Sequence, residues 1–255
     1  NTSGNYNVAV GDSALVSNTT ASNNTAVGNN ALTANTTGAS NTAVGYNSLD
    51  ANTTGAANVA IGTGSLGANT TANNNTAIGT SSLLANTTGA SNVALGTNAL
   101  GANTTASNNT GLGFRALFVN TTASNNTAVG KSALTANTTG AYNTAVGALA
   151  GDAITTGPYN TAFGYLALST ETAGQESVAI GSQALATQNT SGGGAIYNTA
   201  VGTSAGRLVT TGTNNTLIGG LAGDTITTGN RNTALGKGAL GATTTANDTV
   251  GIGHN

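Results

Sequence analysis

Apolar and polar positions follow a short pattern that returns along the whole chain. Each copy contains a pentapeptide close to Asn-Thr-Ala-Val-Gly, in which a large apolar residue precedes the glycine and Thr or Val stands two positions before that residue. Side chains alternate between the faces of a β-strand, so these two positions share one face while Ala and Gly share the other. Thr and Val favour strands, whereas Gly, Asn and Ser favour turns. The pattern predicts a short strand in every copy, as around Val27.

The glycines that close the pentapeptides, here called the marker glycines, measure the period of the repeat. Their numbers rise in steps of 17, with a single step of 21 that contains a four-residue insertion within residues 189–195. We therefore predict one continuous repeat domain over residues 1–255, as a segment of a longer or polymerising fibre. The fifteen marker glycines are Gly11, Gly28, Gly45, Gly62, Gly79, Gly96, Gly113, Gly130, Gly147, Gly164, Gly181, Gly202, Gly219, Gly236 and Gly253.

A repeat unit of this length is too short for a helical hairpin and lacks the leucine-rich pattern. It has the size of one coil of a β-solenoid with two short strands and two turns. The predicted fold is therefore all-β, a β-solenoid of about fifteen coils. A leucine four residues after the marker glycine belongs to the second strand, as at Leu32 and Leu49. We expect these leucines and the apolar residues before the marker glycines, Val129 among them, to form a thin continuous core.

Three coils deviate from the pattern in a way that indicates a packed interior. Each has glycine in place of the leucine and an aliphatic residue three positions later, where other coils have Asn. Apolar volume is removed at one position and supplied at a neighbouring one, as close packing requires. The pairs are Gly151 with Ile154, Gly206 with Val209, and Gly223 with Ile226.

Asparagine forms two columns when the coils are aligned. Thirteen of the fifteen copies have Asn four residues before the marker glycine, and eight consecutive coils have Asn before a Thr pair, from Asn18 to Asn137. Stacked at the roughly 4.8 Å spacing of neighbouring strands, identical amides can hydrogen-bond along a column, as in cross-β ladders. We interpret both columns as structural ladders, with ligand contact or glycosylation of the Asn-Thr-Thr sequons as the alternative.

The Ala and Gly positions of the pentapeptide predict a small-residue face that runs along the solenoid. Residues without bulk let another backbone approach closely, so we expect a second copy of the same surface to cover this face. The first and last coils also lack the atypical capping sequence that solenoids normally carry. We therefore expect self-association, as a trimer or as a filament.

Composition excludes several classes of protein. Thr, Ala, Gly and Asn make up about two thirds of the chain, charged residues make up 5%, and the net charge is −2. Five Lys and Arg residues cannot form the basic surface of a nucleic-acid-binding protein. No apolar run approaches the ~20 residues of a membrane helix, so no membrane insertion is expected. The absence of Cys excludes disulfides and thiolate metal sites.

Candidate catalytic groups are few and scattered. The single histidine is His254, next to the end of the sequence. Asp50, Asp152 and Asp224 share one position in the repeat but lie six and four coils apart, roughly 29 and 19 Å at strand spacing. Paired carboxylates that act together lie within about 10 Å of each other. We expect no enzymatic activity, no cofactor and no metal site.

Two repeated features suggest a binding surface. Tyr142 and Tyr159 share one turn position on adjacent coils, with Tyr6 and Tyr197 at the same position further away. Aligned tyrosine rings could stack on sugar faces or on each other, or simply flank the turns. The Thr pairs form regular ranks such as those of ice-binding solenoids, but their two members are adjacent, so one of each pair points inward or into a turn.

The residues Glu176-Ser177-Val178-Ala179-Ile180-Gly181-Ser182-Gln183-Ala184 resemble the head repeat of YadA-type trimeric autotransporter adhesins. The longer unit Asn-Thr-Ala-Val-Gly-x-x-Ala-Leu-x-Ala-Asn-Thr-Thr-Gly is similar to repeats of phage tail fibres and bacterial surface proteins. This resemblance covers essentially the whole chain. It implies a left-handed parallel β-roll, three chains side by side, and a stalk or adhesive head outside the cell or on a virion. The period of 17 and the lack of a neck, stalk, anchor or chaperone domain depart from the adhesins.

We therefore expect a structural and adhesive fibre segment of a phage tail fibre or bacterial surface adhesin. Its partners would be further copies of the chain and a host-surface glycan or receptor, with Tyr142 and Tyr159 as the glycan contacts. An ice-binding or glycan-binding solenoid is the alternative.

Overall fold

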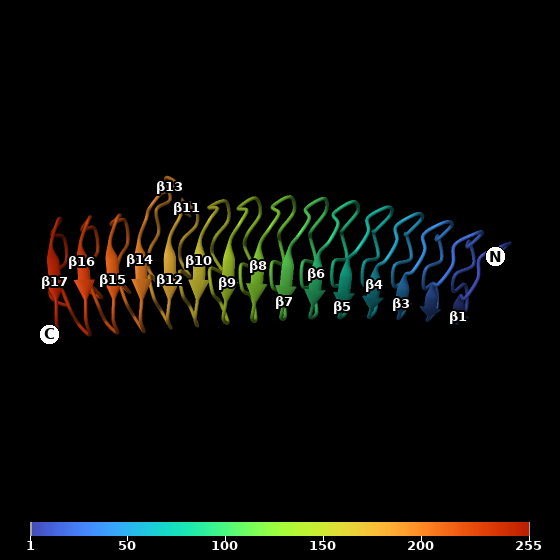
Figure 1. Ribbon diagram of the computed structural model, residues 1–255, viewed down its shortest axis with the longest axis horizontal. Helices are drawn as coiled ribbons and strands as arrows, with labels where there is room; N and C mark the ends of the chain where they lie inside the picture. The colour runs from blue at the N-terminus through green and yellow to red at the C-terminus, as the bar shows by residue number, and fades with distance from the viewer. Residues whose placement is uncertain (1, 255) are drawn as a thin grey trace. The chain divides into compact units, whose positions relative to one another are not determined.

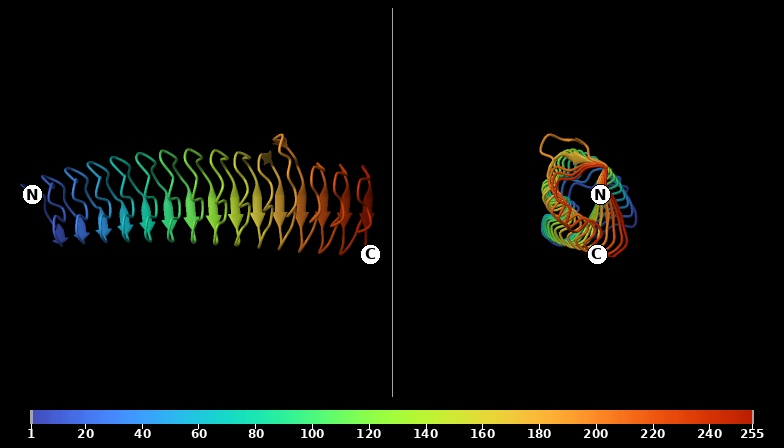
Figure 2. Two further views of the ribbon diagram at one scale, coloured as in Figure 1. Left: turned by 180° about the vertical axis from the view of Figure 1, so that it is seen from behind. Right: turned by 90° about the vertical axis from the view of Figure 1, so that its left-hand side faces the viewer.

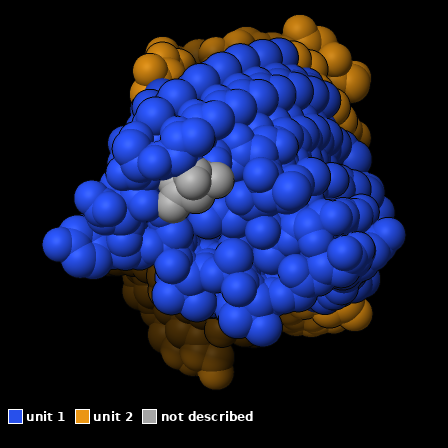
Figure 3. All heavy atoms as spheres, turned by 90° about the vertical axis from the view of Figure 1, so that its right-hand side faces the viewer, with its two compact units in different colours: residues 1–125 blue, residues 126–255 orange. Residues whose placement is uncertain are grey.

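The computed structural model describes residues 2–254, which contain 17 β-strands and no helix (Figure 1). The chain divides into two compact units, Asn1–Asn125 and Asn126–Asn255, drawn in blue and orange in Figure 3. In each unit, three-residue parallel strands recur once per coil and stack in register. Each unit is a β-solenoid, so the predicted fold class is confirmed.

Unit 1 contains the strands of seven coils. Each strand pairs with the next at the same position of the repeat, as Val10 pairs with Val27. The strands are β1 (Val8–Val10), β2 (Thr25–Val27), β3 (Thr42–Val44), β4 (Val59–Ile61), β5 (Thr76–Ile78), β6 (Val93–Leu95) and β7 (Thr110–Leu112).

Unit 2 contains the other ten strands of the described chain and the four-residue insertion. Eight strands form a parallel ladder, and the remaining two, β11 and β13, pair with each other beside the insertion. The insertion loop stands out beyond the neighbouring coils of the unit (Figure 2). The strands are β8 (Thr127–Val129), β9 (Thr144–Val146), β10 (Thr161–Phe163), β11 (Gly174–Gln175), β12 (Val178–Ile180), β13 (Gly194–Ala195), β14 (Thr199–Val201), β15 (Thr216–Ile218), β16 (Thr233–Leu235) and β17 (Val250–Ile252).

The core contains the leucine row, as predicted, but the faces of the strand are the reverse of the prediction. The leucine side chains are buried, and Ala179 at the centre of β12 is completely buried. By contrast, Ile180 is 38% exposed, and Val129 lies on the outer face, half-buried. The prediction that the residues before the marker glycines form the core is therefore wrong.

The shallow interior explains this reversal. In β7 glycine takes the place of the central alanine, and a Cβ built on Gly111 would lie only 3.3 Å from Cγ of Leu100. The leucine side chains, which extend from the opposite side of the coil, thus contact the strand itself. An alanine methyl group fills the space that remains. Because the interior is close-packed, a larger side chain fits on this face only where the leucine is missing.

The marker glycines also lie against neighbouring backbone rather than on an outer surface. Gly45 has a φ of +136°, and a Cβ on it would lie 2.7 Å from the carbonyl carbon of Gly62 in the next coil. Glycine is required there by both the backbone conformation and the close approach. The predicted outer small-residue face is therefore wrong, since its Ala side chains fill the interior and its Gly residues permit the stacking of coils.

Each coil contains one strand rather than the two that were predicted, apart from the short β11 and β13. Leu32 adopts a φ of +52°, as do the equivalent leucines within a few degrees, so the second segment is a turn rather than a strand. A left-handed conformation costs about 1–2 kcal/mol in a non-glycine residue. Burial of the leucine contributes about 1.5–3 kcal/mol, and the Leu32 N–H still donates to the carbonyl of Ser48, at 3.1 Å.

Both asparagine columns are buried ladders, as predicted. In the column before the Thr pairs, Nδ2 of Asn52 donates to Oδ1 of Asn35 at 2.9 Å, which is an amide-to-amide contact. In the column four residues before the marker glycines, Oδ1 of Asn58 accepts the backbone N–H of Asn75 at 2.9 Å. The Nδ2 of Asn58 donates to the carbonyl of Ala72, also at 2.9 Å. The second ladder therefore joins side chains mainly to backbone groups.

The compensating aliphatic residues are buried as predicted. Ile154, Val209 and Ile226 are each no more than 1% exposed. Leu217 at the centre of β15, where the other three-residue strands of unit 2 have Ala or Gly, is a further member of the set that the sequence analysis missed.

Candidate functional surfaces

The outer face of the strand ladder is a regular surface that runs along each unit. This outer strand face consists of the first and third residues of each three-residue strand, which are Thr, Val, Ile, Leu or Phe in every described strand of that length. Several are substantially exposed, such as Leu95 at 47% and Phe163 at 53%. The face is uncharged, with apolar side chains at the third strand position and mostly Thr at the first, and an exposed apolar row of this kind is typical of a surface that contacts a partner.

In most of the Thr pairs only the second Thr is exposed. The first Thr of a pair uses its hydroxyl along the stack, as when Oγ1 of Thr36 donates to the carbonyl of Thr53 at 3.0 Å. The second Thr, such as Thr37, is exposed. The Thr pairs thus cannot present two hydroxyls per coil on one face.

Tyr142 and Tyr159 lie on adjacent coils of unit 2, and their rings stack on each other. The ring centroids are 5.1 Å apart and the ring planes differ by 5°. Both residues are exposed, at 52% and 54%, and both have a φ of +61°. Stacking covers one face of each ring, so a sugar could stack only on the remaining faces. Glycan contact by these residues stays a prediction.

The position of these tyrosines continues into the next two coils as Glu176 and Tyr197. Glu176 lies 17 residues after Tyr159, before the insertion, and was missed because only aromatic residues were compared with each other. Aligning the position five residues before each marker glycine places Glu176 between Tyr159 and Tyr197. Hydrogen bonding to the Glu176 carboxylate raises the pKa of the Tyr197 phenol, and the negative charge of Glu176 adds to the effect. We call Tyr142, Tyr159, Glu176 and Tyr197 the Tyr–Glu column.

Other exposed aromatic side chains lie close to the Tyr–Glu column in the sequence. Phe163 ends β10 and is 53% exposed, and Tyr165 follows two residues later with 52% exposed. Five of the nine aromatic residues of the chain therefore fall between Tyr142 and Tyr197.

The acidic residues do not assemble into a reactive cluster. Burial raises the pKa values of Asp50 and Asp152, each partly offset by backbone hydrogen bonds. Asp50 belongs to unit 1, whereas Asp152 and Asp224 lie four coils apart in unit 2. Within residues 2–254, no group of three His, Cys, Asp or Glu side chains is placed to hold a metal ion.

Glu171 is completely buried in the column where other coils have ladder asparagines. Its Oε1 accepts the N–H of Thr172 at 2.9 Å and that of Gly174 at 2.8 Å. Its Oε2 accepts Nε2 of Gln188 and Oγ1 of Thr190, both at 3.0 Å. These donors satisfy the carboxylate, so Glu171 is a structural residue at the insertion.

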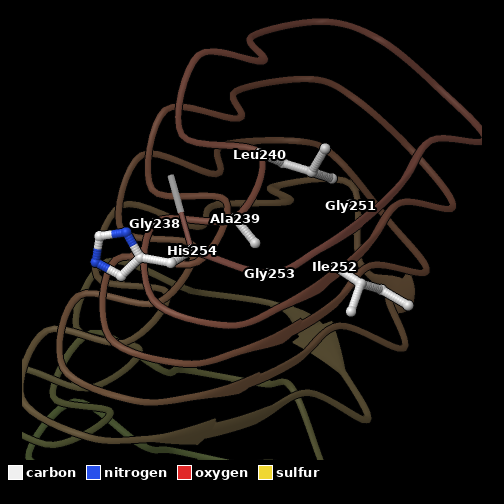
Figure 4. Close-up of a pocket in the computed structure, with 7 residues that line it drawn as sticks. All are labelled: Gly238, Ala239, Leu240, Gly251, Ile252, Gly253 and His254. Carbon is white, nitrogen blue, oxygen red and sulfur yellow. The ribbon is translucent and has the colours of Figure 1, made fainter.

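The last described coil of unit 2 contains a hollow of about 210 Å³ (Figure 4). Glycine backbone and the side chains of Leu240 and Ile252 line it, and His254 extends its imidazole away from these two side chains. No second titratable residue is among the described lining residues, so the hollow brings no acid or base to His254.

The part of the chain that the structure describes contains no helix of the length and hydrophobicity needed to cross a lipid bilayer. No protein-family model, curated protein or solved structure matches the chain. The resemblance to adhesin heads and phage tail fibres therefore stays a prediction.

Proposed function

We propose that the chain is a structural and adhesive segment of a fibre, either a phage tail fibre or a bacterial surface adhesin, that acts outside the cell. The observation that carries the proposal is the in-register stacking of coils within each unit, with buried asparagine ladders parallel to the strand ladder, two in unit 1 and one in unit 2. Buried hydrogen bonds in a low-dielectric interior resist separation of neighbouring coils. Such a solenoid serves as a stiff support that displays its turns to a receptor.

Self-association is the second part of the proposal, and the outer strand face is the surface that supports it. The small-residue face lies inside, so it cannot be the contact between copies. The outer strand face is uncharged and has an apolar residue at the third position of every three-residue strand, and partner surfaces are depleted of charge at their centre. Further copies of the chain would cover it, as a trimer or as a filament.

Light scattering on the purified chain tests this proposal. A mass near three times the chain mass of 24.3 kDa, or a concentration-dependent larger mass, is the expected result. Replacing both Val93 and Leu95 of β6 by Lys should reduce the mass to that of a monomer without lowering the melting temperature. Thr88→Lys, at an exposed turn position, is the matched control and should leave the assembly intact.

A monomer at all concentrations, or assembly unaffected by the β6 substitutions, would overturn self-association through the outer strand face. An ice-recrystallisation assay on the same preparation tests the ice-binding alternative, since a plain fibre segment should be inert.

A further inference from the structure

The Tyr–Glu column sets four side chains side by side on successive coils of unit 2. The Tyr159 N–H donates to the carbonyl of Ala141, at 3.1 Å, and the Glu176 N–H donates to that of Pro158, at 3.4 Å, so the coils are in register at this turn. In unit 1 the equivalent position after Tyr6 holds Asn, Ser or Ala. The turn therefore does not require an aromatic or acidic residue for its own geometry.

One face of the Tyr159 ring lies on the side of the next coil, which contains Glu176. Tyr142, on the preceding coil, covers the other face with nearly parallel stacking. The next coil places Glu176 at the same position, about one strand spacing of ~4.8 Å away along the stack. Tyr197 follows on the coil after that, and its phenol hydrogen-bonds the Glu176 carboxylate. An exposed aromatic ring and a half-buried carboxylate thus occupy the same turn position on successive coils.

No basic residue lies near Glu176 in the sequence. Between Lys131 and Arg207 the chain has three acidic residues and no Lys, Arg or His. The one ion pair among the described residues joins Arg231 to Asp248, so Glu176 has no cationic partner in the fold. The negative charge is therefore available to a ligand of opposite charge.

We propose that Tyr159 and Glu176, bordered by Tyr197, form a binding site for an alkylammonium cation. Such a cation is attracted to the electron-rich face of an aromatic ring, and aromatic cages recognise quaternary ammonium groups in this way. The Glu176 carboxylate supplies the counter-charge, and the Tyr197 phenol is its neighbour on the following coil. The site does not depend on the fibre role proposed above, because a monomeric solenoid would contain it equally.

NMR titration of the whole chain with choline chloride, at constant ionic strength, tests the proposal. Saturable shifts of the Tyr159 and Tyr197 ring resonances are expected, whereas Tyr6 should not move. Tyr6 is the matched internal control, because it has the same turn position and is also exposed to solvent but has Asn23 in place of a carboxylate on the next coil. n-Butylammonium, which imitates a lysine side chain, distinguishes a lysine source from a choline source by its relative affinity.

Three variants separate the contributions of the Glu176 carboxylate, the Tyr159 ring and the Tyr197 hydroxyl to choline binding. All three residues are accessible to solvent, and the melting temperature of each variant shows whether it still folds. Glu176→Gln keeps the size of the side chain and should weaken choline binding at least ~3-fold, as should Tyr159→Leu. Tyr197→Phe should change the affinity less than either. Equal binding of the neutral isostere 3,3-dimethylbutan-1-ol, binding of a methyl glycoside without binding of choline, or unchanged affinity in Glu176→Gln would each overturn the proposal.

Discussion

The side chain of Leu217 occupies the space in front of Gly223, where most coils have a leucine. A Cβ built on Gly223 would lie 2.7 Å from Cδ2 of Leu217 and 2.9 Å from Cδ1 of Ile226. The core volume is therefore conserved although the residues that supply it come from different parts of the coil. Only coils that lack the leucine four residues after the marker glycine have room for a residue larger than alanine at the centre of the strand.

The exchange of volume between these positions can be tested by a double-mutant cycle. Leu217→Ala should cost about 2–5 kcal/mol of unfolding free energy because it leaves a cavity. Gly223→Leu should also destabilise, since the new side chain would overlap Leu217. Together the two changes remove the overlap with Leu217, although Ile226 still lies beside the new leucine, so their combined cost should be below the sum. Additive costs, measured by denaturant unfolding, would contradict the packing described for Leu217.

The reversed strand faces predict opposite outcomes for two neighbouring residues. Ala179→Asp buries an unpaired carboxylate and should unfold the coils around β12. Ile180→Asp places the same charge on the outer strand face and should change the unfolding free energy by less than about 1 kcal/mol. Circular dichroism melting curves measure both. Similar losses at the two positions would mean that the outer strand face is packed against part of the same chain.

The buried ladder makes Asn58 far more sensitive than an exposed asparagine with a similar contact. Asn58→Ala leaves the N–H of Asn75 unpaired in the interior, at a cost of about 1–3 kcal/mol, and removes one of two donors to the carbonyl of Ala72, which Nδ2 of Asn69 also contacts. Asn73 also accepts a backbone N–H, that of Ala56, but it is exposed, and water can replace it in Asn73→Ala. Hydrogen exchange should show lost protection at Asn75 in the first variant alone. Equal stability of the two variants would argue against a structural role for the ladder.

Close stacking of the coils predicts that the marker glycines cannot be replaced. Gly45→Ala should cost several kcal/mol, because the methyl group would meet the backbone of Gly62 and the φ of +136° disfavours an L-residue. The control is Gly192→Ala in the insertion loop, where no atom lies within 4 Å of the added Cβ. That variant should melt within about 1–2 °C of the parent chain. Tolerance of alanine at Gly45 would show that the coils can move apart.

Asp152 should make the stability of unit 2 depend on pH in the acidic range. Burial raises its pKa above 3.8, and its Oδ1 is buried with no hydrogen-bond partner among the described residues. Because the pKa of Asp152 is higher in the folded state than in the unfolded state, its ionisation does not destabilise the native state at a pH below the unfolded-state pKa. Ionisation destabilises the native state as the pH rises through the folded-state pKa. Asp152→Asn should therefore stabilise the chain at pH 7 and have little effect near pH 3. Asp12→Asn, at an exposed position, is the control for removal of one charge.

The regular period of the sequence was enough to predict the solenoid, the buried leucines and the asparagine ladders. It could not decide which face of the strand lies inside, because alternation defines two faces without ranking them. Hydrophobicity favoured the residues before the marker glycines as the core residues. The depth of the interior, however, decides which face of the strand can be buried. That depth depends on the left-handed turn that places Leu100 across the core from the strand. Stacking of Tyr142 on Tyr159 was one of the predicted alternatives. Glu176 was missed because the search compared aromatic residues only with each other.

The insertion in unit 2 adds residues at one corner while the strand ladder stays in register. Ile180 pairs with Val201 as if the four extra residues were absent, and Glu171 and Gln188 replace the ladder asparagines beneath the loop. The strands of the ladder thus tolerate almost no change in length, whereas the loop between Gln188 and Ile196 accepts four extra residues. Foreign peptides grafted between Ser191 and Gly193 should be displayed without disturbing the scaffold, which makes the corner the natural route by which such a protein acquires new recognition loops.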